Sequence, residues 1–168
     1  ARAWADHLQT EYLRFYYARR LSDGIDDLSL DFDDFVGAIN GELVGKIVNL
    51  CSRTIGFVGK RFDGHIAGRD PEAGQLITQL RQRSGKAVQC FADFKHAQAM
   101  RLLIESADEA NTYLQDRAPW ALYKGDPKAA QARVPHLLPC ASRHTGCGVL
   151  GRFRLLLWCF RMIIIITP

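Results

Sequence analysis

Three side chains in this sequence have the chemistry needed to hold a nucleic-acid base. Asn49 and Arg53 are four residues apart, so on a helix they project from the same face. A planar amide and a planar guanidinium can together hydrogen-bond the edge of a base. Trp120, in the sequence Ala118-Pro119-Trp120, supplies a ring on which a base can stack. These residues predict a pocket for one unstacked RNA base.

Each of these residues also has a simpler explanation. Asn49 and Arg53 fit a solvated helix face, and Trp120 fits a core or boundary aromatic. Lys60 and Arg61 fit a pair of charges at a helix end as well as a contact to an RNA backbone, and the helix-end role is preferred. The RNA interpretation therefore depends on the surrounding sequence.

The net charge gives that interpretation little support. The 168-residue chain has a formal charge of +4, but residues 1–130 carry 17 basic and 18 acidic residues. Residues 131–168 carry five arginines and no acidic residue. Because the excess of positive charge lies at the end of the chain, any RNA contact must come from the local placement of side chains.

Hydrophobic spacing with the helical period runs through most of residues 1–133 and predicts an all-α chain. Between the first two helices, residues 25–30 are expected to form a short strand or an extended connector. Apolar stripes predict helices over residues 6–20, from 31 to 57 or 62, over 71–83 and over 86–117, and a short helix over 128–133.

Polar and small residues mark the expected helix ends. Asp31 and Asp70 are expected to cap helix N-termini. Ser84-Gly85 is expected to break the chain between the third and fourth helices, and Pro119 to follow the end of the fourth. The Gly-Asp-Pro sequence at 125–127 predicts a turn.

Residues 134–168 fit neither the helical nor the strand period. Ile163–Ile166 is a β-prone run, and no apolar stretch reaches the roughly 20 residues that a membrane span needs. Gly146–Gly151 reads G-x-G-x-x-G without the strand and helix that would make it a nucleotide site. Four side chains that can bind zinc match no familiar zinc module: His136, Cys140, His144 and Cys147.

The residues indicate no catalytic group and no metal site. His7, His65 and His96 have no identifiable nucleophile or carboxylate partner. The acidic residues between 23 and 34 suit helix capping and solubility better than metal binding. Five cysteines without a disulfide framework, and an N-terminus without a signal-peptide pattern, predict a cytoplasmic protein.

Several ordered motifs together resemble the C-terminal part of the bacterial methionine–tRNA ligase family, which are class I aminoacyl-tRNA synthetases. The resemblance covers residues 1–133 and implies an antiparallel helical bundle with an N-terminal connector helix. The motifs are Glu11–Ala18 (EYLRFYYA), Ile25–Asp31 (IDDLSLD), Val48–Arg53 (VNLCSR), Lys60–Gly64 (KRFDG), Asp108–Asn111 (DEAN) and Ala118–Trp120 (APW).

The resemblance implies roles for six residues. Asn49 and Arg53 would hydrogen-bond anticodon bases, chiefly the wobble cytosine. Trp120 would stack on that base, and Pro119 would shape the turn before it. Two residues three apart on one helix face would sit near the same pocket: Asp108 and Asn111.

The resemblance also implies a division of the chain. Residues 1–30 would be a connector helix and linker after a catalytic domain that is absent here, residues 31–133 the anticodon-binding bundle, and residues 134–168 an atypical tail. The chain holds no HIGH-type or KMSKS-type motif, so we expect it to be inactive alone and to bind no cofactor. The family uses ATP and Mg²⁺, often with Zn²⁺.

The implied function is recognition of the CAU anticodon of initiator and elongator methionine tRNA, as part of ATP-dependent tRNA aminoacylation. The implied partners are this tRNA and the enzyme's own catalytic domain, with no membrane. The alternative is a non-catalytic helical protein-interaction module, in which Trp120 belongs to a protein interface.

The tail departs from the family, which has a further helix there. A one-base shift of the reading frame after Arg133 would explain the departure (hypothesis). Resequencing the coding DNA tests it, and the idea fails if neither frame resembles the family. Without that helix the apolar stripe of residues 86–117 would be partly uncovered, so marginal stability is expected.

Overall fold

The computed structural model describes residues 6–22, 24, 29–63, 65 and 71–134, and every structural statement below concerns these residues. Most of residues 25–30, residues 66–70 and the whole of 135–168 lie outside them. The expectations placed there lie outside them too: the connector, the N-cap at Asp70, the isoleucine run, the glycine motif and the four side chains that can bind zinc. The regular elements are all helical, which confirms the all-α class. They are α2 (Thr10–Arg20), α3 (Phe32–Gly37), η1 (Ala38–Val48), α4 (Asn49–Phe62), α5 (Pro71–Ala92), α6 (His96–Arg117), α7 (Pro119–Leu122) and α8 (Pro127–Arg133).

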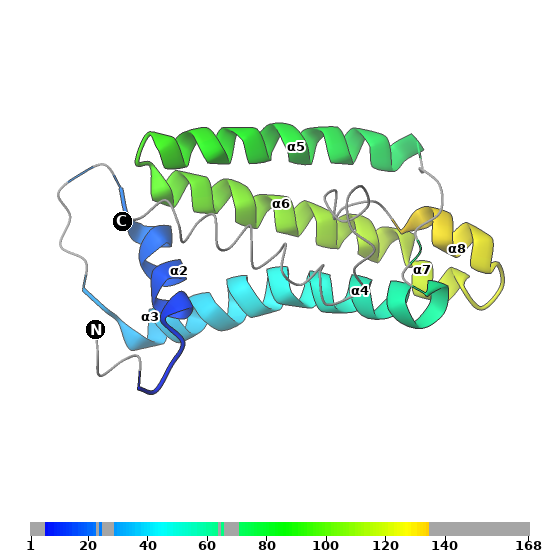
Figure 1. Ribbon diagram of the computed structural model, residues 1–168, viewed down its shortest axis with the longest axis horizontal. Helices are drawn as coiled ribbons and strands as arrows, with labels where there is room; N and C mark the ends of the chain where they lie inside the picture. Colours follow the sequence, from blue (N-terminus) through cyan, green and yellow to red (C-terminus); the bar gives the residue numbers. More distant parts are fainter. Residues whose placement is uncertain (1–5, 23, 25–28, 64, 66–70, 135–168) are drawn as a thin grey trace.

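The helices α3, η1 and α4 join into one continuous rod, as the sequence predicted (Figure 1). The backbone stays in the right-handed helical region at both junctions, Gly37 and Asn49. The middle section η1 is a π-helix, a register that is rare and that the sequence did not predict. Figure 1 shows α5 and α6 side by side above this rod, with α2 at one end and α7 and α8 at the other.

The expected break at Ser84-Gly85 is wrong, because α5 continues through it to Ala92. A glycine inside a helix costs only about 1 kcal/mol relative to alanine, and the Ser84 hydroxyl donates to the Leu80 carbonyl within the helix (2.8 Å). The chain turns at Phe94 instead, where φ is 61°. Backbone bonds from Phe94 to Phe91 (3.1 Å) and from Lys95 to Cys90 (2.8 Å) form the usual glycine-type helix end, here with a phenylalanine.

Most of the other predicted helix ends are confirmed. The carboxylate of Asp31 accepts hydrogen bonds from the backbone N–H groups of residues 33 and 34 at the start of α3. At residues 125–127, where only a turn was predicted, Asp126 accepts from residues 128 and 129 in the same way at the start of α8. The helix α6 ends at Arg117, two residues before Pro119. These caps satisfy N–H groups that have no partner inside the helix.

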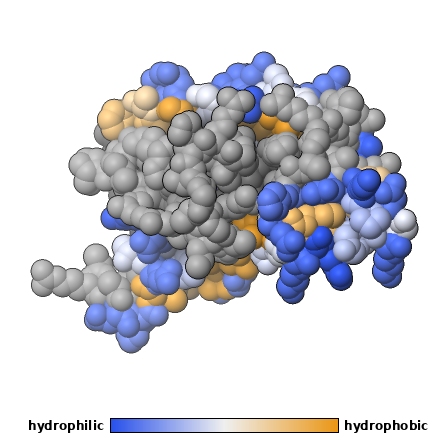
Figure 2. All heavy atoms as spheres, turned by 45° about the vertical axis from the view of Figure 1, so that its right-hand side comes forward, coloured by the Kyte–Doolittle hydropathy of each residue, from blue (hydrophilic) through white to orange (hydrophobic). Residues whose placement is uncertain are grey.

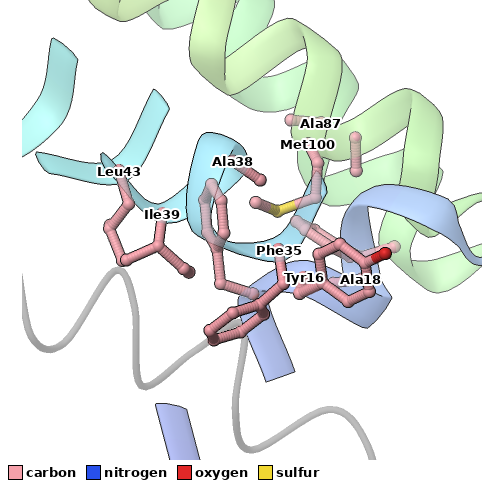
Figure 3. Packing of buried hydrophobic residues seen from close by; sticks show 11 residues of the cluster. Tyr16, Ala18, Phe35, Ala38, Ile39, Leu43, Ala87 and Met100 are labelled. Carbon is pink, nitrogen blue, oxygen red and sulfur yellow. The ribbon is translucent and has the colours of Figure 1, made fainter. Parts of the chain in front are cut away.

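The main core lies where α2, the start of the rod and α6 meet (Figure 3). Tyr16 and Met100 are almost completely buried, and Phe35 contacts Tyr16 edge to face with 5.5 Å between ring centroids. Each large apolar side chain buried in this way contributes about 1.5–3 kcal/mol. The core therefore fixes α6 against the rod.

Ion pairs at the edge of this core join α2 to the rod. Arg19 pairs with Glu42 of η1 (3.0 Å) and with Asp34 of α3 (3.4 Å), and Arg20 also reaches Asp34 (3.2 Å). Burial by itself raises the pKa of Asp34, but a hydrogen bond from Tyr16 and the two guanidinium charges lower it below its ordinary value. The expected connector helix is therefore attached to the bundle.

Candidate nucleic-acid interface

The structure brings together two of the residues predicted to bind a base. Arg53 lies on α4 and Trp120 on α7, and the Cζ atom of Arg53 lies 4.5 Å from the centroid of the Trp120 ring. This is the geometry of a cation–π contact. Arg53 is exposed and, within the described part of the chain, forms no ion pair. Its charge and its N–H groups are therefore available to a ligand.

The backbone before Trp120 determines where its ring lies. Ala118 ends α6 in the left-handed conformation (φ 37°), and its N–H donates to the Leu114 carbonyl at 3.1 Å. Pro119 occupies the first position of α7, where its missing N–H costs nothing, and its side chain is buried. The chain changes direction at this point, which places Trp120 against α4.

Asn49 lies at the junction of η1 and α4, one helical turn before Arg53. Its side chain is exposed. The buried side of α4 is marked by Cys51, Ile55 and Val58, so Asn49 and Arg53 belong to the opposite, open side. The predicted shared face of these two residues therefore agrees with the structure, while their contacts with bases stay a prediction.

Asp108 and Asn111 have a partner of a different kind. The Asp108 carboxylate pairs with the Lys46 ammonium at 2.7 Å, and the Asn111 amide donates to the Lys46 carbonyl at 3.0 Å. Both contacts join α6 to η1 at Lys46, which lies three residues before Asn49. The structure thus gives these two residues a role in holding the rod that carries Asn49 and Arg53. A base contact by either of them stays a prediction.

Sequence reasoning missed the aromatic residues beside this site. Tyr123 lies edge to face with Phe57 and Phe62, with centroids 6.0 and 5.6 Å apart, and Phe57 and Phe62 are 5.5 Å apart. The Cζ atom of Arg61 lies 5.0 Å from the centroid of the Tyr123 ring. Their spacing could have indicated them, because residues three or four apart on a helix share a face. Phe57 is four residues after Arg53, and Tyr123 is three residues after Trp120.

Three further properties of the described residues concern metal binding, membrane spanning and the reactivity of a cysteine. The described residues include no group of three or more His, Cys, Asp or Glu side chains placed to hold a metal ion. In that same part of the chain, no helix is long and apolar enough to cross a membrane. Burial raises the pKa of Cys51 to about 11, so this thiol stays protonated at neutral pH.

Comparisons with known proteins match this architecture. A family model described as tRNA synthetases class I (M) matches residues 1–55. The methionine–tRNA ligase of Psychrobacter cryohalolentis is 40% identical over 124 residues, which are 74% of this chain and 18% of that protein. The same enzyme from another Psychrobacter strain is 37% identical over the same shares of the two chains.

Solved structures show the same fold. A Mycobacterium tuberculosis methionyl-tRNA synthetase in complex with methionyl-adenylate has a TM-score of 0.69 and 24% sequence identity. The match covers 79% of this chain and 26% of that one. The apo form of the M. tuberculosis enzyme gives a TM-score of 0.70.

The helical fold and the family match define the class: this chain is related to the class I tRNA synthetases. Within that class its relatives are the methionine–tRNA ligases, which confirms the resemblance found in the sequence. The chain spans about a fifth of the length of these relatives.

Proposed function

We propose that the face formed by α4 and α7 recognises the CAU anticodon of methionine tRNA, in both the initiator and the elongator species. The observation that carries this proposal is the Arg53 guanidinium lying over the Trp120 ring, with Asn49 exposed one turn away. Planar donors and an aromatic ring at one place are what recognition of an unstacked base requires.

The proposed chemistry divides between stacking and hydrogen bonding. The wobble cytosine stacks on the indole of Trp120, and stacking contributes about 1–3 kcal/mol per base. Asn49 and Arg53 donate hydrogen bonds to the acceptors on the base edge. Pro119 fixes the turn that holds the indole, while Lys46, Asp108 and Asn111 hold the rod against α6.

The wider role follows from the relatives and is also a proposal. In a complete protein, this recognition would serve ATP-dependent attachment of methionine to its tRNA in the cytoplasm. ATP, Mg²⁺ and, in many members, Zn²⁺ would act in a catalytic domain, which would be the second partner of this bundle. The chain described here would supply recognition and no catalytic residue.

Binding of an anticodon stem-loop to the full chain tests the proposal. Trp120→Ala is expected to weaken binding of a CAU loop about 5- to 150-fold, which corresponds to the stacking energy. Arg53→Ala should also weaken it, while Arg101→Ala, an exposed arginine on α6, should not. If both site variants bind the CAU loop as the unchanged chain does, relative to a scrambled loop, the proposal is wrong. The protein-interaction alternative would then be preferred.

A further inference from the structure

A second arginine–aromatic pair lies beside the proposed base site. The Arg61 guanidinium lies over the Tyr123 ring as that of Arg53 lies over the Trp120 ring, and each pair joins α4 to the segment around α7. The two arginines are eight residues apart on α4, a rise of about 12 Å along the helix. The two arginine–aromatic pairs therefore lie one after the other along α4, each against the segment around α7.

The contacts of Tyr123 make this second pair rigid. Phe57 and Phe62 contact the Tyr123 ring edge to face, so the ring that supports the Arg61 guanidinium is itself supported from α4. Arg61 is exposed and has no ion-pair partner among the described residues. An exposed guanidinium of this kind has N–H groups that can donate to an acceptor outside the protein.

The net charge around the two arginine–aromatic pairs is positive, whereas the rest of residues 1–130 has a negative net charge. Residues 49–63 and 117–130 together carry six basic and two acidic residues. The remainder of residues 1–130 carries eleven basic and sixteen acidic residues. The excess of positive charge within residues 1–130 is therefore found around the two arginine–aromatic pairs. Figure 2 brings the right-hand side of Figure 1 forward and shows mainly hydrophilic residues around a small apolar area at the right of the molecule.

We propose that Arg61, held against the Tyr123 ring, binds a backbone phosphate of the RNA strand whose base stacks on Trp120. This inference rests on the proposed function and adds a contact to the backbone that carries no sequence information. Guanidinium groups bind phosphate oxygens through two parallel hydrogen bonds. Lys60 and Lys124 are exposed neighbours of the stacked pair in the sequence and add to the positive potential.

The salt dependence of binding separates this role from a structural one. Each phosphate contact to a single strand contributes about 0.7 to the slope of log affinity against log salt concentration. Arg61→Ala should lower that slope by about this amount for a CAU loop and a scrambled loop alike. It should weaken both about two- to fivefold, the range for exposed ion pairs. The preference for the CAU loop should stay unchanged.

Matched variants complete the experiment. Tyr123→Phe keeps the ring and should bind like the unchanged chain, whereas Tyr123→Leu removes it and should weaken binding. Arg81→Ala, an exposed arginine on α5, should leave the slope unchanged. If Arg53→Ala weakens CAU binding but Arg61→Ala leaves affinity and slope unchanged, the phosphate contact is refuted and the proposed function stands. If neither variant has an effect, both are refuted.

Discussion

Replacing Gly85 by alanine tests the finding that α5 is one uninterrupted helix. Gly85 lies in the middle of α5, and a Cβ added there would meet nothing within 4 Å. The change therefore gains or loses no contact, and the expected effect is the difference in helix propensity, a stabilisation of about 0.5–1 kcal/mol. For a chain of this size the melting temperature should rise by about 1–4 °C.

Urea denaturation followed by far-UV circular dichroism measures this effect directly. Gly45→Ala is the matched control, because a Cβ at position 45 would lie 3.0 Å from the Asn40 carbonyl oxygen in the π-helix. That variant should gain no stability or lose some. If the chain instead broke at residues 84–85, Gly85→Ala would leave the free energy of unfolding unchanged or lower it, and the reasoning would be refuted.

Three further predictions concern other residues. Asp126→Ala should cost about 1 kcal/mol by removing the N-cap of α8, as measured by denaturation; no loss would mean the cap contributes nothing. The pKa of Asp34 is lowered in the folded state, so its contribution is complete well above 3.8 and is lost as the pH falls through the folded pKa. The stability difference between the unchanged chain and Asp34→Asn should therefore be greatest at neutral pH and shrink on acidification; a constant difference would contradict this. With the three cysteines beyond residue 134 replaced by serine, a thiol reagent at pH 8 should modify Cys90 well before Cys51, since burial raises the pKa of Cys51; equal rates would contradict the burial.

The helix pattern was readable from the sequence because local chemistry determines it. The capping carboxylate of Asp31 and the proline at 119 act within one turn of the residues they affect. The turn at Phe94 was not readable, because a phenylalanine takes the left-handed position that usually belongs to glycine. The π-helix was also missed, since its register depends on packing rather than on residue preferences.

The candidate site was predictable only in part. The helical spacing of Asn49 and Arg53 places them on one open side of α4, and the resemblance to a family added Trp120. The arrangement of Trp120 over Arg53 depends on how α7 folds back after Ala118, which is a tertiary feature. For the same reason the contacts of Asp108 and Asn111 with Lys46 could not be predicted from the sequence.

The affinity of the unchanged chain for two stem-loops tests the central claim most directly. One loop carries CAU and the other differs only in having uridine in place of the wobble cytosine. Base-specific recognition at Asn49, Arg53 and Trp120 predicts that the CAU loop binds about 5- to 150-fold more tightly. Equal affinities for the two loops at the same salt concentration would contradict the proposal that this face reads an anticodon.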